Sequence, residues 1–284
     1  MSGIKLAGAQ WSWVGASLRE SAGIYRALGI GAMDLITAPG MPLDVGEIES
    51  DPQAVARRVG EDLADVEVEL VNLMTLIGTD FEDRALNSPD QEMRRRNADS
   101  VAALCEFAAA AGLKSITLVP GVEQPGMSRE DAQALSAEAL RAAAETGTRA
   151  GVDVVFEPHR ESVLESPAET LAFMQQNPDL RICVDYSHCV SIGYREEELH
   201  PLLPYAGHVH LRQGAAGQIQ ARWDDGEIDY PGLMRRLAEQ GYDGYATLEY
   251  EHEEVWDMDK ADTIKETIRM RDAVLPFVAA SVSP

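Results

Sequence analysis

The chain of 284 residues carries 24 Lys and Arg against 48 Asp and Glu, which gives a formal net charge of −24. This excess of negative charge argues against a nucleic-acid partner, because proteins that bind phosphates present a basic face, and an anionic membrane surface would repel the chain as well. Hydrophobic residues make up 45% of the sequence and charged residues 25%, which is the composition of a folded globular protein.

Sequence features of export or membrane insertion are missing. The first ten residues lack the basic region and the long apolar core of a signal peptide. No run of about 18 apolar residues occurs anywhere, so no membrane span is expected. The three cysteines, Cys105, Cys183 and Cys189, are too few for a disulfide framework and form no Cys-x-x-Cys pattern. We therefore expect a cytoplasmic protein in a reducing environment.

Short apolar runs alternate with amphipathic stretches along the chain. Eight runs predict strands, at residues 4–9, 33–37, 68–76, 115–119, 152–157, 181–185, 208–211 and 245–249. Eight stretches predict helices, at residues 18–28, 53–64, 91–111, 129–150, 168–176, 196–203, 232–240 and 263–279. The predicted strands are apolar on both faces, which is typical of parallel strands covered by helices.

Residues that begin and end helices stand close to these boundaries. Ser166 and Ser88 are each followed three residues later by Glu or Gln, the pattern of a capping box. Asp229 is placed to cap the helix that follows it. Glycine follows four of the predicted helices, at positions 29, 112, 151 and 241, where a left-handed cap favours it.

Eight strand–helix units of roughly 30–35 residues predict one (β/α)8 barrel, a TIM barrel, as a single domain over residues 1–284. The alternative is an open doubly wound sheet, but no Gly-x-Gly-x-x-Gly follows the first strand, so a dinucleotide-binding fold has little support. No low-complexity linker divides the chain. The active site of such a barrel lies at the C-terminal ends of its strands.

Ionisable residues stand at the ends of the last four predicted strands. They are Glu157, Asp185, His210 and Glu249, each about one strand–helix unit from the next. Because residues two apart share one face of a strand, we expect these four to point into the barrel while their apolar neighbours point toward the helices. Four side chains from four neighbouring strands would then meet at the barrel mouth.

Three carboxylates that face one another repel, and each would raise the pKa of the others unless a cation joined them. Three oxygen ligands and one imidazole predict one divalent ion, with Mn²⁺ preferred, Mg²⁺, Co²⁺ and Fe²⁺ as alternatives, and Zn²⁺ less favoured without thiolates. Any one of the four residues alone could equally be a salt-bridged residue of the barrel. The metal interpretation depends on all four occurring on consecutive strands.

The motifs around these residues resemble those of the xylose-isomerase-like family of sugar isomerases and epimerases, which are TIM barrels. The matching motifs are Phe156-Glu157, Val184-Asp185-Tyr186-Ser187-His188, Gly207-His208-Val209-His210 and Gly241-Tyr242-Asp243-Gly244-Tyr245 with Leu248-Glu249. The resemblance implies that Glu157, Asp185, His210 and Glu249 are the metal ligands. It also implies that Glu157 and Glu249 form the catalytic base and acid pair, and that His188 binds the substrate.

The resemblance implies an enzyme that removes the proton next to the carbonyl of a keto (oxo) sugar, through an enediolate that the metal stabilises. Ketose epimerases of the family carry a further Glu and Arg where this chain has Val163 and Ala216. These departures point to a branch with another substrate. A lyase that uses the same chemistry, either a 3-oxo C-glycoside deglycosidase or an oxo-inositol dehydratase, is therefore an alternative.

Two further classes of protein are alternatives to a sugar isomerase or lyase. A non-catalytic sugar-binding subunit is the second alternative, although a decayed site would usually have lost a ligand. A metal-dependent endonuclease of the related barrel family would need more His ligands and a basic rim, and the charge of −24 opposes it. The expected partners are a small sugar or glycoside substrate and either further copies of the chain or a small partner subunit.

Four more residues are candidates for the site. Trp11 and Trp13 follow the first strand, and they could bind the C–H face of a sugar or pack in the rim. Arg212, two residues after His210, is a candidate substrate-binding residue that could replace the missing Arg. His159, on the same strand face as Glu157, is either a general base for an elimination or a solvated loop residue.

Overall fold

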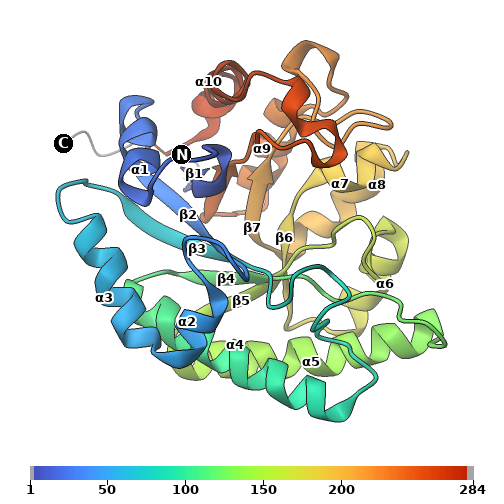
Figure 1. Ribbon diagram of the computed structural model, residues 1–284. Helices are drawn as coiled ribbons and strands as arrows, with labels where there is room; N and C mark the ends of the chain where they lie inside the picture. Colours follow the sequence, from blue (N-terminus) through green and yellow to red (C-terminus); the bar gives the residue numbers. More distant parts are fainter. Residues whose placement is uncertain (1–2, 280–284) are drawn as a thin grey trace.

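The computed structural model describes residues 3–279 of the chain. These residues form a closed barrel of eight parallel strands in chain order, with β8 paired to β1 (Figure 1). The strands are β1 (Lys5–Ala9), β2 (Ala32–Thr37), β3 (Glu69–Thr75), β4 (Ser115–Leu118), β5 (Asp153–Phe156), β6 (Arg181–Val184), β7 (Ala206–Leu211) and β8 (Tyr245–Leu248). The predicted TIM barrel is confirmed. Of its predicted span, residues 1–2 and 280–284 lie outside the described residues.

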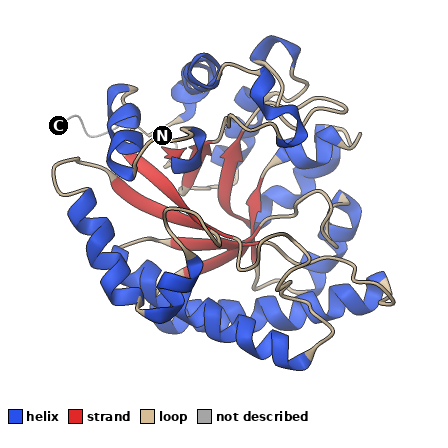
Figure 2. Cartoon of the chain, in the orientation of Figure 1, coloured by secondary structure: helices blue, strands red, loops and turns tan. Residues whose placement is uncertain are grey.

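Helices surround the ring of strands (Figure 2). They are α1 (Leu18–Ala27), α2 (Val45–Ser50), α3 (Pro52–Asp62), α4 (Gln91–Ala111), α5 (Arg129–Ala150), α6 (Pro167–Gln176), α7 (Tyr186–Ser191), α8 (Glu196–Leu199), α9 (Tyr230–Glu239) and α10 (Thr263–Val274). The 3₁₀ segments are η1 (Gln10–Ser12), η2 (His200–Tyr205), η3 (Trp223–Asp225), η4 (Val255–Lys260) and η5 (Leu275–Phe277). Within the described part of the chain, none of the helices has both the length and the apolar character needed to cross a bilayer.

The strands agree with the sequence prediction to within a residue or two, and the helices differ where proline or local capping intervenes. The helix predicted at 196–203 ends at Leu199 as α8 and continues as η2, because Pro201 at the start of η2 has no N–H for the helical ladder. The helix predicted at 263–279 ends at Val274 and is followed by the 3₁₀ turn that holds Pro276. The short helices α2 and α7 were not predicted.

The caps were predicted in part. Asp229 caps α9 by accepting a hydrogen bond from the Gly232 amide, as predicted. The two predicted capping boxes were wrong. Asp90 rather than Ser88 caps α4, and the side chain of Ser166 makes no capping hydrogen bond. Both long helices, α4 and α5, end at glycines in the left-handed region, at positions 112 and 151, as predicted.

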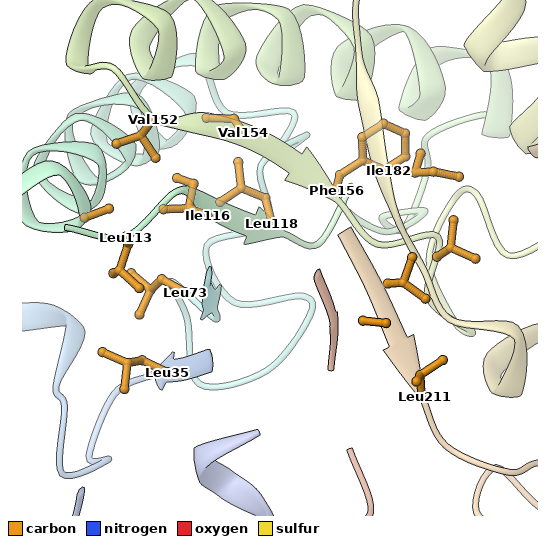
Figure 3. Packing of buried hydrophobic residues seen from close by; sticks show 14 of the residues in the cluster. Leu35, Leu73, Leu113, Ile116, Leu118, Val152, Val154, Phe156, Ile182 and Leu211 are labelled. Carbon is orange, nitrogen blue, oxygen red and sulfur yellow. The ribbon is translucent and has the colours of Figure 1, made fainter. Parts of the chain in front are cut away.

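The core is the layer between the barrel and its helices (Figure 3). In this layer Phe156 of β5 packs edge-on against Phe173 of α6, with ring centroids 5.8 Å apart. Ile182 and Leu211 occupy the same layer on β6 and β7. Because side chains alternate along a strand, the residues between these apolar ones turn into the barrel. This alternation delivers the polar residues of the strand ends to the mouth.

Gly8 of β1 is required by the ring of Tyr25 in α1. A Cβ at position 8 would lie 2.0 Å from Tyr25 Cε1, and the buried Tyr25 hydroxyl donates to the Ala9 carbonyl at 2.8 Å. We expect Gly8→Ala to lower the free energy of unfolding by about 1–3 kcal/mol, the usual cost of overpacking a core. Gly23→Ala in α1 is the matched control. A Cβ at position 23 would meet no atom within 4 Å, and alanine favours a helix. The free energy of unfolding of Gly23→Ala should therefore stay the same or rise. Denaturant unfolding measures both, and equal stabilities would contradict this account.

Candidate metal centre and active site

The four predicted ligands meet at the C-terminal mouth of the barrel. His210 lies in β7, and its Nδ1 atom is 2.9 Å from Glu157 Oε1 and 3.3 Å from Glu249 Oε2. The ligand atoms of Asp185, His210 and Glu249 all lie within 4.8 Å of one another. All four residues are buried. His210 also belongs to a second such group, with Glu157 and Cys183, so it links the four predicted ligands into one cluster, which we call the carboxylate cluster.

Backbone pairing fixes where the carboxylates stand. Glu157 and Glu249 each follow their strand by one residue, and their amides still bond the neighbouring strand, at Leu118 and Leu211 respectively. Asp185 follows β6 and caps α7, since its Oδ1 atom accepts from the Ser187 amide at 2.8 Å. Its Oδ2 atom faces the cluster and accepts a hydrogen bond from Arg212 Nη2 at 2.8 Å.

The donor set fits a divalent cation. Three carboxylates and one imidazole are ligands that Mn²⁺, Mg²⁺ and related ions accept. Glu249 Oε2 is buried without a hydrogen-bond partner, which is costly for a carboxylate oxygen unless a cation binds it. Cys183 lies below the cluster, 3.8 Å from Glu157 Oε1, but burial raises its pKa and keeps it a thiol. Glu157, Asp185, His210 and Glu249 are therefore the residues that would hold an ion.

Burial and mutual contact shift the protonation of the cluster. Burial raises the pKa of both Glu157 and Glu249. For Glu157 the hydrogen bond and charge of His210, together with the charges of His159 and Arg212, outweigh burial, and the pKa is lowered. For Glu249 burial prevails, and the pKa stands well above its usual value. Burial alone would lower the pKa of His210, yet the surrounding acidic groups, Glu249 and Asp34 among them, raise it well above the ordinary range. A cation that enters the cluster must therefore displace protons.

Arg212 is bound by carboxylates from two strand ends. Its Nη2 atom lies 2.8 Å from Asp185 Oδ2 and 3.6 Å from Glu249 Oε2, and its Nη1 atom lies 2.5 Å from Glu251 Oε1. The Nε atom is 3.3 Å from the Ser187 hydroxyl. Burial raises the pKa of the Glu251 carboxyl to about 7, although Arg212 lowers it. The predicted substrate-binding arginine thus lies at the site with its donors already engaged.

Two histidines and a phenylalanine form one wall beside the cluster. The rings of His159 and His188 lie 3.8 Å apart, and Phe81 packs edge-on against His159 at 4.6 Å. His188 Nε2 is 3.4 Å from Asp185 Oδ2 and 3.7 Å from Glu157 Oε2. Burial lowers the pKa of both histidines, His188 the more strongly. His159 is buried, so its interpretation as a solvated loop residue was wrong.

The tautomer of His159 follows from its hydrogen bond. Its Nδ1 atom contacts the Arg160 carbonyl oxygen, which can only accept. Nδ1 therefore carries the proton and Nε2 carries the lone pair when the ring is neutral.

Trp11 and Trp13 take different positions. Trp11 lies beside the cluster, its ring edge-on to His210 with centroids 6.0 Å apart. Trp13 instead packs against Tyr25 of α1, with centroids 5.4 Å apart, as part of the hydrophobic core. This placement supports Trp11 as a wall of the site. Trp13, which directly follows η1, packs in the core and does not take the sugar-binding position that was one of its two predicted roles.

Asp34 of β2 joins the site and was not predicted. Its Oδ2 atom accepts from His208 Nε2 at 2.7 Å and lies 3.7 Å from His210 Nε2. Burial would raise the pKa of Asp34, but His208 and His210 lower it to about 2. The only local signal is a carboxylate inside an otherwise apolar strand. Glu251, which bonds Arg212, also went unpredicted, although it shares a strand face with Glu249.

Comparison with known proteins agrees with this geometry. The family model described as the xylose isomerase-like TIM barrel matches residues 24–274. The chain belongs to this family. A curated relative, the 2-oxo-tetronate isomerase of Pectobacterium atrosepticum, is 28% identical over 171 residues, which are 57% of this chain and 63% of that protein. The aligned part thus spans less than two thirds of the relative.

Solved structures share the fold along nearly the whole chain. An L-ribulose 3-epimerase superposes with a TM-score of 0.72 at 16% identity, covering 99% of this chain and 100% of that one. A structure of the IOLI protein with a zinc atom gives 0.71 at 14% identity, covering 99% and 100%. A xylose isomerase-like TIM barrel protein from Mycobacterium smegmatis in complex with magnesium gives 0.64 at 17% identity, covering 92% and 89%. At these identities the likeness concerns the fold.

The protons held in the cluster predict how metal affinity depends on pH. His210 and Glu249 both have raised pKa values, and both must lose a proton to bind an ion. We expect the affinity for Mn²⁺ to rise as the pH increases through neutrality and protons to be released on binding. Calorimetric titration in buffers of different ionisation enthalpy measures both quantities. A constant affinity between pH 6 and 8 with no proton release would contradict the assignment.

Asp34 is expected to orient His210. The Asp34 carboxylate lies 3.7 Å from His210 Nε2, too far for a hydrogen bond, but its charge favours the proton on Nε2 and so directs the Nδ1 lone pair toward the cluster. We expect Asp34→Asn to weaken Mn²⁺ binding up to about 10-fold, the lower end of the effect of losing a hydrogen-bonded partner of a ligand. Asp62→Asn, an exposed carboxylate at the end of α3, is the control. Nitrogen chemical shifts of labelled histidine report the tautomer, and unchanged shifts with unchanged affinity would refute the role of Asp34.

Proposed function

We propose that this protein is a divalent-metal-dependent isomerase or epimerase of keto sugars that works by removing the proton next to a carbonyl. The observation that carries the proposal is the carboxylate cluster, in which His210 contacts both Glu157 and Glu249 and shares a ligand group with Asp185. Membership of the xylose isomerase-like family supports the same chemistry.

The proposed reaction needs a base, an acid and stabilisation of negative charge on oxygen. A divalent cation held by the cluster would act as a Lewis acid that polarises the sugar carbonyl and stabilises the enediolate. Glu157 Oε1 is engaged by His210, so Oε2, which faces His188 at 3.7 Å, is the oxygen available to take the proton. Glu249 stands on the other side of His210 and would return a proton to the second carbon or the opposite face.

Neighbouring side chains would orient the substrate. His188 is neutral at physiological pH, since burial lowers its pKa, and it lies beside both Glu157 and Asp185. A neutral imidazole in this place can hydrogen-bond a sugar hydroxyl without adding charge. Trp11, beside His210, and Phe81, beside His159, offer apolar walls.

A lyase is the second candidate, and His159 is the observation that favours it. His159 lies in one ligand group with Glu157 and His188, and its Nε2 atom carries the lone pair. A neutral imidazole is a suitable general base for an elimination that follows enolisation. The two candidates share the first proton transfer and differ in whether a β-substituent then leaves.

The deciding experiment is exchange of substrate hydrogen with solvent. The protein loaded with Mn²⁺ is incubated in deuterated buffer with four- to six-carbon ketoses and with a 3-oxo-glycoside. Deuterium at the carbon next to the carbonyl, with a new ketose or aldose formed, supports the isomerase or epimerase. Release of an aglycone supports the lyase. Sugar binding without deuterium exchange or product contradicts both and favours a binding protein.

Glu249→Gln tests the proton-transfer role. The change keeps the volume of the side chain but removes the carboxylate that exchanges the proton, so we expect the exchange rate to fall about 10²- to 10⁴-fold. Circular dichroism and the melting temperature check the fold, and bound metal is measured separately because Glu249 is also a proposed ligand. Glu254→Gln, an exposed residue of the following loop, is the control. Exchange at the wild-type rate in Glu249→Gln would exclude the assigned role.

A further inference from the structure

Arg212 differs from the other basic residues of the described chain in its burial. Of the arginines and lysines in residues 3–279, it alone is buried, and it stands at the barrel mouth where the substrate would bind. A buried arginine at such a place would ordinarily recognise a carboxylate or phosphate of the substrate. Here its donors are engaged from within the chain. Arg212 Nη1 donates to Glu251 Oε1, and Arg212 Nη2 donates to Asp185 Oδ2.

The net charge of the barrel mouth disfavours binding of an acidic substrate. Glu157, Asp185, Glu249 and Glu251 bring four negative charges when ionised, Arg212 returns one positive charge, and a divalent cation returns two. One net negative charge then remains before any substrate enters. Asp34, one layer deeper, adds another carboxylate. Because charges interact strongly in a buried site, a further carboxylate would be repelled, whereas a neutral sugar would not.

Cationic side chains on the surrounding segments also form ion pairs with acidic residues. Arg129, which begins α5 after β4, lies 2.9 Å from a carboxylate oxygen of Glu169. Lys260, in the segment after β8, lies 2.9 Å from Asp259. Arg160, beside His159, also lies 3.8 Å from Glu161. Each of these three cations thus has an acidic neighbour that offsets part of its charge.

We propose that the site accepts an uncharged keto sugar and rejects the 2-oxo acid of the same length, and that Glu251 sets this preference by neutralising Arg212. The proposal rests on the proposed function and narrows its substrate class. It distinguishes this chain from its bacterial relative, whose name gives an acid, 2-oxo-tetronate, as the substrate. Glu251 is then a specificity-determining residue that acts through Arg212 and lies outside the set of proposed metal ligands.

The test uses two four-carbon compounds that differ at one group. Erythrulose has a hydroxymethyl group where 2-oxo-tetronate has a carboxylate, and both carry the same hydrogen next to the carbonyl. Deuterium exchange at that carbon is measured for each with the Mn²⁺-loaded protein at pH 8, for the wild type, Glu251→Gln and the control Glu254→Gln. We expect wild type and control to favour erythrulose in kcat/KM by about 100-fold or more, since an unpaired buried charge is expensive. In Glu251→Gln the ratio should fall at least tenfold.

A binding measurement keeps the proposal separate from the proposed function. Erythronate, a four-carbon acid that cannot enolise, is titrated calorimetrically into the same three Mn²⁺-loaded proteins, and Glu251→Gln should bind it at least ten times more tightly than wild type. If neither substrate exchanges, the enolisation chemistry is contradicted, and erythronate affinity alone decides the role of Glu251. A wild type that prefers 2-oxo-tetronate, or a Glu251→Gln protein with unchanged selectivity and unchanged erythronate affinity, overturns the inference.

Discussion

The crowding of carboxylates in a small, dry space is the constraint on which the barrel mouth depends. Glu157, Asp185 and Glu249 converge because β5, β6 and β8 end at the same rim of the barrel, with β7 between the last two, and their mutual repulsion must be balanced. His210 stands between two of them, and Arg212 bonds the third. The protein side chains alone leave protons trapped in the cluster, as the raised pKa of Glu249 indicates. A divalent cation is the simplest group that would relieve this imbalance.

The layer beneath the cluster is polar as well, and it connects opposite parts of the barrel. Asp34 of β2 bonds His208 of β7, and Thr247 of β8 contacts the same imidazole nitrogen at 3.0 Å. These contacts cross the interior of the ring and fix His208, whose imidazole lies edge-on to that of His210 with ring centroids 5.3 Å apart. The surroundings of His210, a proposed metal ligand, therefore include residues that would contact neither the metal ion nor the substrate.

Much of this molecule could be predicted from the sequence, and the parts that could not have a common reason. Strand order, the inward face and the meeting of Glu157, Asp185, His210 and Glu249 follow from periodicity and even spacing, which are local signals. Asp34 escaped prediction because its partner, His208, lies 174 residues away. The engagement of Arg212 by Glu251 is equally non-local. Helix α7 was missed because it depends on the cap that Asp185 provides and spans only six residues.

The proposed metal ligands and the aromatic walls of the site come from different parts of the chain. All four proposed ligands come from β5 to β8, whereas the aromatic walls at Trp11 and Phe81 come from segments after β1 and β3. Loops that follow the early strands can therefore diverge without disturbing the acid–base groups. A lineage built on this plan could reshape the aromatic walls of its site by remodelling these early loops, while Asp34 of β2 and the charged residues that follow β5 to β8 stayed under steady selection.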